Sequence, residues 1–169
     1  MRTYLFYITA LSVFVLDQLS KYVVVHAMNL RELGAIDVLP PFLNFRMGWN
    51  RGINFGLFGD GHDLMRWVLI AVALVIVIWV YLWIRREAPG PRAEIAAGLL
   101  IGGALGNVID RLLYGAVADF LNMSCCGIRN PYTFNIADIA IFAGAIGLIF
   151  FTGGERDGKA RNENGDKKA

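Results

Sequence analysis

The sequence predicts an all-α membrane bundle of four transmembrane helices, with a small exported β-hairpin or sheet resting on the outer membrane surface. Of the 169 residues, 56% are hydrophobic and only 18% are charged, and the mean hydropathy of +0.50 is too high for a soluble domain of this size. Four apolar stretches approach the length of about 20 residues that crosses a bilayer. They are residues 3–26, 67–84, 95–113 and 136–152.

Basic residues predict the orientation of these helices, because Lys and Arg beside membrane spans favour the cytoplasm. Arg2, the loop from Arg85 to Arg92 and the basic residues of the tail all fall on one side. Both termini are therefore expected in the cytoplasm, with segments 27–66 and 114–135 exported. The net charge of +2 follows from this topology and gives no support to nucleic-acid binding.

The chain is expected to form one membrane-embedded domain over residues 1–152, followed by a polar cytoplasmic tail over residues 153–169. No internal repeat is visible. The first apolar stretch is expected to stay attached rather than be removed as a signal sequence. Asp17 and Lys21 interrupt its outer part, and no cleavage site of the A-x-A type follows.

Between the first two spans, residues 43–49 alternate between apolar and other side chains, as in a half-buried strand. Residues 53–57 alternate in the same way, and the residues between them, Asn50-Arg51-Gly52, are typical of a turn. Because an isolated hairpin is marginal in water, we expect this one to rest on the membrane. In the third span, glycines at close to four-residue spacing predict a packing seam for another helix. These are Gly98, Gly102, Gly103 and Gly106.

Three carboxylates on different helices are expected at one depth. With a rise of 1.5 Å per residue, Asp17 is about 21 Å from residue 3, Asp110 about 23 Å from residue 95, and Asp138 about 21 Å from residue 152. All three therefore lie a little beneath the outer surface of a core about 30 Å thick. An acid inside a membrane marks a functional site by default.

Four of the charged residues near this level have an opposite charge close in sequence. Asp17 and Lys21 are four residues apart and share a helix face, so they can pair. Asp110 is followed by Arg111, and Asn107 lies one turn earlier, directed into the bundle with Asp110. Scaffolding and charge compensation are favoured over chemistry for these charged residues, because an unpaired buried charge is costly.

Asp119 and Asp138 have no such partner nearby in sequence. Asp119 follows Gly115, which lets the chain turn back toward the bundle, and Asp138 lies at the start of the fourth helix. Two carboxyl groups held close share a proton and supply a base and an acid together, which suits peptide hydrolysis by water. Alternatively, Asp138 caps its helix and Asp119 marks a turn. Spacing alone favours neither interpretation.

Other chemistry has little support in the sequence. His26 and His62 are far apart and lack the spacing of a metal site. Ser12 and Ser20 have no histidine partner nearby, and phosphate-loop glycine patterns are absent. We therefore expect neither a metal nor another cofactor.

Five segments, in this order, resemble the lipoprotein signal peptidases, also called signal peptidase II. They are Asp17-Gln18-Leu19-Ser20-Lys21, Asn50-Arg51-Gly52-Ile53-Asn54-Phe55-Gly56, Gly102-Gly103-Ala104-Leu105-Gly106-Asn107-Val108-Ile109-Asp110-Arg111, Val117-Ala118-Asp119-Phe120 and Phe134-Asn135-Ile136-Ala137-Asp138. The segments extend over nearly the whole chain up to the tail. Arg51 departs from the threonine that many relatives have there, and Ile53-Asn54 replaces two small residues.

The resemblance implies an aspartic endopeptidase of the bacterial inner membrane, active near the periplasmic face and without a cofactor. Its catalytic aspartates would be Asp119 and Asp138. It would act, as a monomer, on prolipoproteins whose cysteine carries diacylglycerol, cut just before that cysteine, and bind membrane lipid and globomycin-type inhibitors. The residues that would line or support the site are Asp17, Lys21, Asn50, Gly52, Asn107, Asp110, Arg111 and Asn135.

Two other classes of function compete with this one. A small proton-coupled membrane transporter also places acids on several helices at one depth. Its relay should continue toward the cytoplasm, whereas the inner halves of the four predicted spans contain no acid or base. The third interpretation is a non-enzymatic assembly factor whose polar layer holds helices together; it should tolerate amide replacements of the acids.

Overall fold

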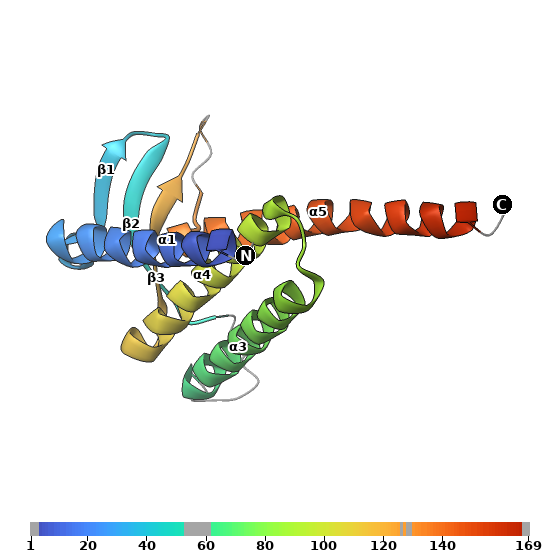
Figure 1. Cartoon of the computed structure of the whole chain (residues 1–169). Coiled ribbons are helices and arrows are strands. Elements are labelled where there is room, and N and C mark those ends of the chain that lie inside the picture. Colours follow the sequence, from blue (N-terminus) through green and yellow to red (C-terminus); the bar gives the residue numbers. More distant parts are fainter. Residues whose placement is uncertain (1–3, 53–61, 126, 128–129, 167–169) are drawn as a thin grey trace.

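A computed structural model describes residues 4–52, 62–125, 127 and 130–166 of the chain. Helices make up most of the fold, and a small sheet adjoins them (Figure 1). In chain order the elements are α1 (Tyr4–Lys21), the π-helix η1 (Tyr22–Ala27), α2 (Leu30–Leu33), β1 (Ala35–Leu39), β2 (Leu43–Asn50), α3 (His62–Glu87), α4 (Pro91–Tyr114), β3 (Val117–Met123) and α5 (Ile136–Asp166).

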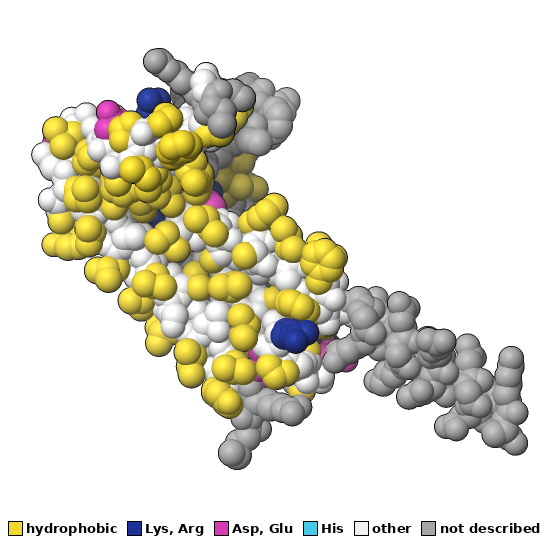
Figure 2. Space-filling view, turned by 90° about the horizontal axis from the view of Figure 1, so that it is seen from above, with side chains coloured by type: hydrophobic (Ala, Val, Ile, Leu, Met, Phe, Trp, Pro, Cys, Tyr) yellow, Lys and Arg dark blue, Asp and Glu magenta, His cyan; other side chains and the backbone are white. Residues whose placement is uncertain are grey.

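Within the described residues, three helical segments are long and apolar enough to cross a membrane. They are Tyr4–Ala27, Leu64–Glu87 and Pro91–Tyr114, each of 24 residues. They contain almost all of the first three predicted spans. The fourth predicted span corresponds to Ile136–Thr152, a shorter apolar segment at the start of α5. Apolar side chains cover much of the described surface, as expected for helices that face lipid (Figure 2).

α4 is the central helix and contacts α1, α3 and α5. Its glycines allow close approach: a Cβ added at Gly98 would lie 2.8 Å from the carbonyl oxygen of Phe6, and one at Gly103 would lie 2.5 Å from that of Ala137. α1 and α5 therefore pack directly against the backbone of α4, and the predicted glycine seam is confirmed.

The sheet is antiparallel with the strand order β1-β2-β3. The predicted strand over residues 43–49 is confirmed as β2, which pairs with β1 on one side and β3 on the other. Its predicted partner, residues 53–57, lies outside the described residues. β3 comes from the second connecting segment, far along the chain, and its Asp119 pairs with Gly48 of β2.

The two ends of the bundle differ (Figure 1). The sheet stands at the end where α1 finishes and α5 begins. The start of α1 and the connection from α3 to α4 lie at the opposite end. The acids predicted to share one depth therefore lie at the sheet end, where helices and strands meet.

Candidate active site

Asp119 reaches the bundle because the chain reverses immediately after α4. Gly115 ends that helix in a left-handed conformation with φ of +76°, which favours glycine. β3 then begins at Val117, opposite Asn50 of β2. Asp119 is only 3% exposed.

Asp138 lies in the first turn of α5 and does cap that helix. Its backbone N–H donates to Asn135 Oδ1 at 2.9 Å, and the backbone N–H of Asn135 donates back to Asp138 Oδ2 at 3.2 Å. This reciprocal pair satisfies two N–H groups that a helix leaves without partners. The other carboxylate oxygen, Oδ1, accepts a hydrogen bond of 2.9 Å from Asn107 Nδ2. Capping therefore fixes the direction in which Asp138 presents its carboxyl group.

One asparagine holds both acids. The side-chain Nδ2 of Asn135 donates to Asp119 Oδ1 at 2.6 Å and lies 3.3 Å from Asn107 Oδ1, while its backbone contacts Asp138. Asn135 and Asn107 are both buried. The amides thus bring the two carboxyl groups together, although they are separated in sequence and lie on different elements.

The surroundings of Asp119 favour its protonated form. Burial, followed by repulsion from the Asp138 carboxylate, raises the pKa of Asp119 to about 7, although side-chain hydrogen bonds from Asn50 and Asn135 act in the opposite direction. Near neutral pH the pair can therefore hold one proton between two carboxyl groups. Such a pair can activate water as a base and polarise a carbonyl group as an acid.

A second polar cluster lies beside the first. Lys21 Nζ is 2.7 Å from Asp17 Oδ2 and 2.8 Å from Asp110 Oδ2, and all three side chains are buried. These are the only ion pairs within 4.0 Å among the described residues. The predicted pairing of Asp17 with Lys21 is confirmed.

The close ion pair of Asp110 is with Lys21 and not, as the sequence suggested, with Arg111, which interacts with Asp110 only at longer range. Consecutive residues on a helix point about 100° apart, so Asp110 faces α1 and meets Lys21 while Arg111 turns away. Arg111 donates instead to the backbone carbonyl of Asn107 at 3.3 Å. It lies within electrostatic reach of Asp138, Asp119 and Asp110, in decreasing order of strength.

The Lys21 cluster also contacts the backbone immediately before each acid of the pair. Asp110 Oδ2 accepts a hydrogen bond of 3.1 Å from the N–H of Ala118, and Asp17 Oδ1 accepts one of 2.9 Å from the N–H of Ala137. Through these contacts, one ammonium group and two carboxylates connect α1, α4, β3 and α5. The cluster therefore positions Asp119 and Asp138 through their neighbours.

Gln18 belongs to this cluster and was not among the predicted site residues. Its Nε2 donates to Asp17 Oδ2 at 3.2 Å, to Asp110 Oδ1 at 3.1 Å and to the carbonyl oxygen of Gly106 at 3.3 Å. The sequence did contain a signal for Gln18. Its side-chain amide is next to Asp17 in sequence, and Asp17 was expected at the same depth as Asp110.

The predicted turn after β2 also supports the site. The N–H of Gly52 donates to Asn50 Oδ1 at 3.0 Å, and Gly52 has φ of +86°. A Cβ added there would lie 2.6 Å from Leu69 Cδ1, so both the conformation and the space require glycine. With its oxygen occupied by the turn, Asn50 has its amide NH₂ available for Asp119.

Of the predicted site residues, the structure brings five together around the carboxyl pair: Asp119, Asp138, Asn50, Asn107 and Asn135. Asp17, Lys21 and Asp110 form the adjacent cluster. Among the residues whose side chains are described, no group of three His, Cys, Asp or Glu side chains has the arrangement of a metal site.

The fold and site together define a helical membrane protein that carries a pair of carboxyl groups at one end of its bundle. The profile of the family described as "Signal peptidase (SPase) II" matches residues 9–152. The chain belongs to this family, as its five sequence segments indicated, and it is an integral membrane protein.

Individual relatives agree with this assignment. The lipoprotein signal peptidase of Methylorubrum extorquens (strain PA1) is 50% identical over 111 residues, which are 66% of this chain and 64% of that relative. The lipoprotein signal peptidase of Alteromonas mediterranea is 38% identical over 167 residues, covering 96% of this chain and 87% of the relative. The match therefore spans less than two thirds of the first relative but most of the second.

Solved structures share the fold. A structure described as "Bacterial membrane enzyme structure by the in meso method at 1.9 A resolution" has a TM-score of 0.72 and 31% identity, covering 86% of this chain and 90% of that chain. A second, described in the same words at 2.3 Å resolution, has a TM-score of 0.70 and 31% identity.

Proposed function

We propose that this chain is an aspartic endopeptidase that removes the signal peptide from diacylglyceryl-modified prolipoproteins, cutting N-terminal to the lipidated cysteine. Membership of the signal peptidase II family supports the substrate class. The single observation that carries the proposed chemistry is the contact of Asn135 with both Asp119 and Asp138. This contact supports the proposal that the two carboxyl groups act as a pair sharing one proton.

In the proposed reaction, the ionised carboxylate of the pair takes a proton from water, and the resulting hydroxide adds to the scissile carbonyl carbon. The protonated carboxyl group donates a hydrogen bond to the carbonyl oxygen, on which negative charge develops. As the carbon–nitrogen bond breaks, the leaving nitrogen receives a proton from the pair. No covalent intermediate with the enzyme forms, and the pair returns to its singly protonated state.

The remaining site residues support this pair. Asn107 and Asn135 fix the orientation of the carboxyl groups, and Asn50 stabilises the ionised form of Asp119. Arg111 supplies positive charge beside the pair, where it can bind the substrate backbone. Asp17, Lys21 and Asp110 act through the backbone, and Gly52 shapes the turn that presents Asn50.

The proposed topology has four spans, with Ile136–Thr152 as the fourth. Both termini would lie in the cytoplasm, and the sheet would lie at the periplasmic face of the bacterial inner membrane. The carboxyl pair at the sheet end would then meet a lipid-anchored cysteine near the outer boundary of the bilayer. Globomycin-type inhibitors would occupy the same site, and the enzyme would act as a monomer.

Cleavage of purified prolipoprotein by the full chain tests this proposal. Diacylglyceryl-modified substrate should be cut, and the unmodified form should be cut at least tenfold more slowly. Globomycin should block cleavage of the modified substrate. Equal cleavage of both forms would contradict the lipid-dependent assignment, and absence of cleavage by folded preparations would contradict the proposed function itself.

One buried acid bears on the transporter alternative. The predicted third span began at residue 95, but α4 begins at Pro91, so Glu94 lies inside the helix and is 1% exposed. Glu94 and Asp110 are sixteen positions apart, which is about 24 Å along the helix axis. No titratable residue of α4 lies between them. This helix therefore offers no titratable side chain that could relay a proton between Glu94 and Asp110. The presence of Glu94 does not favour a transporter.

A further inference from the structure

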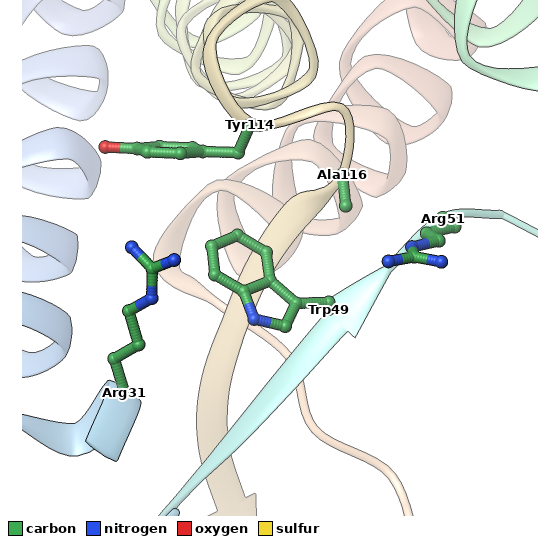
Figure 3. A pocket seen from close by; sticks show the side chains of 5 residues that line it. All are labelled: Arg31, Trp49, Arg51, Tyr114 and Ala116. Carbon is green, nitrogen blue, oxygen red and sulfur yellow. The ribbon is translucent and has the colours of Figure 1, made fainter. Parts of the chain in front are cut away.

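We propose that a cavity between α2, the end of β2 and the end of α4 binds the phosphate-bearing headgroup of an anionic phospholipid. The cavity has a volume of about 360 Å³ and is lined by Arg31, Trp49, Arg51, Tyr114 and Ala116. The side chains of Arg31 and Arg51 approach it from opposite sides, with the indole of Trp49 between them (Figure 3). This site is additional to the carboxyl pair and does not depend on the proposed peptidase activity.

Strand geometry separates the cavity from the carboxyl pair. Successive residues of a strand point to opposite faces of the sheet. Asn50 contacts Asp119, whereas its neighbour Trp49 lines the cavity. Trp49 pairs with Ala118 and Gly48 pairs with Asp119, so the same alternation holds on β3. The cavity therefore lies on the face of the sheet opposite the Asp119 side chain, and Trp49 and Tyr114 separate it from a smaller pocket lined by Lys21 and Asp110.

The charges around the cavity favour an anion. Among the described residues, neither Arg31 nor Arg51 has a carboxylate within 4.0 Å or a side-chain hydrogen bond, and no acidic residue lines the cavity. Guanidinium groups match phosphate oxygens through paired N–H donors. An anion bound in the cavity would be attracted by the positive charge of both guanidinium groups.

The aromatic residues indicate a lipid rather than a soluble anion. The rings of Trp49 and Tyr114 are 5.6 Å apart, and the two side chains are 37% and 46% exposed. Tyr114 is the last residue of a helix long enough to cross a membrane. Trp and Tyr gather at the level of lipid headgroups, where one end of the side chain is apolar and the other is hydrated.

Exposed apolar side chains follow or precede lining residues closely in sequence and would accommodate the acyl chains. Leu33 of α2 is 62% exposed and Leu113 of α4 is 67% exposed, and both lie close to lining residues in sequence. The cavity is large enough for a headgroup but too small for a whole phospholipid. A bound lipid would therefore place its phosphate in the cavity, within reach of the arginines, and its chains against the outer surface of the bundle.

Thermal unfolding of the purified full chain in detergent, titrated with dioleoyl-phosphatidylglycerol, tests the proposal. Phosphatidylglycerol should raise the midpoint of unfolding in a saturable way, and zwitterionic phosphatidylcholine should not. The double variant Arg31→Gln/Arg51→Gln should bind phosphatidylglycerol at least tenfold more weakly, and each single variant should have an intermediate effect. The matched control is Arg46→Gln, since Arg46 is an exposed arginine of β2 outside the cavity.

Each other outcome would overturn the proposal. A similar loss in Arg46→Gln would indicate general attraction to a basic surface, and an equal response to phosphatidylcholine would remove the role of charge. Stabilisation by inorganic phosphate as strong as that by phosphatidylglycerol would indicate a site for free phosphate. Arginine-dependent binding of a short polyglutamate peptide, without any effect of phosphatidylglycerol, would indicate an acidic peptide as the ligand. If the double variant does not fold, the single variants test the proposal, and unchanged phosphatidylglycerol binding in both of them would overturn it.

Discussion

Asn135 donates a hydrogen bond of 2.6 Å from its side chain to Asp119, so the residue that precedes α5 also ties that helix to β3. The same residue exchanges capping hydrogen bonds with Asp138. An ordinary helix cap has thereby become the connection between two carboxyl groups. Capping and catalysis, which the sequence left as alternatives for Asp138, are compatible functions of one side chain.

Replacing either acid by its amide should abolish prolipoprotein cleavage. Asp119→Asn and Asp138→Asn each remove the shared proton, so turnover should fall by about 10²–10⁴-fold, the usual contribution of general acid–base catalysis. Initial rates with diacylglyceryl-modified substrate measure the effect. Glu32→Gln, an exposed acid on α2, serves as the control and should leave the rate unchanged. Normal turnover in either aspartate variant would rule out the carboxyl pair.

Cleavage should decline as the pH rises through about 7, because the pair then loses its shared proton. The hydrogen bond from Asn50 lowers the pKa of Asp119, so Asn50→Ala should move this decline to higher pH. The pH dependence of kcat/KM measures the shift. Arg46→Gln on the same strand should leave the profile in place, and an unshifted profile in Asn50→Ala would contradict the assigned contact.

Protein stability should follow the same titration. The pKa of Asp119 is raised in the folded state from 3.8 to about 7, so the folded protein binds this proton more tightly than the unfolded chain does. Its stabilising contribution is therefore complete below about pH 3.8 and lost as the pH rises to about 7. Relative to Asp119→Asn, the wild type should become less stable over this range. Unfolding midpoints at several pH values check this, and a constant difference would contradict it.

Removing the ammonium group between Asp17 and Asp110 should destabilise the fold. Lys21→Met leaves two buried carboxylates without a counter-charge, a change that costs about 3–5 kcal/mol in the free energy of unfolding. The triple variant Asp17→Asn/Lys21→Met/Asp110→Asn should recover part of this loss, because no unpaired charge remains. Unfolding in mixed detergent measures both. Recovery of stability without recovery of cleavage would agree with a positioning role, whereas a stable Lys21→Met would contradict the cluster.

The contact between α4 and α5 should not tolerate an added methyl group. A Cβ at residue 103 would lie 2.5 Å from the carbonyl oxygen of Ala137, beside Asp138. Gly103→Ala should therefore cost about 1–3 kcal/mol in unfolding free energy and also slow cleavage. Gly90→Ala is the matched control, because nothing lies within 4 Å of a Cβ there. Equal stability of the two variants would contradict close packing at Gly103.

Hydropathy predicted the long helices well, since length and apolar composition alone define a segment that can cross a membrane. The glycine seam was equally clear, because small residues repeated at helical spacing are typical of helices whose backbones approach closely. The bounds were less accurate: α4 starts four residues before the predicted stretch, which brings Glu94 inside. Capping and local packing determine where a helix begins and ends, and hydropathy carries no information about either.

Contacts between distant segments were harder to predict. β2 was recognised from its alternation, but its pairing with β3 depends on a segment about 70 residues further on. The partner of Asp110 was misassigned because nearness in sequence was taken for nearness in space. Helix rotation places residue 110 toward α1 and residue 111 away from it. The link from Asn135 to Asp119 could not be predicted from the sequence, because an asparagine before a helix usually has only the capping role.

The hydrogen bond from Ala137 to Asp17 joins residues 120 positions apart. During synthesis, α1 is made first and α5 last, so this contact can form only after almost the entire apolar part of the chain has left the ribosome. Until then Asp138 has no fixed place beside Asp119. A nascent or prematurely terminated chain would thus remain inactive, and biogenesis itself would protect the membrane from an unfinished peptidase.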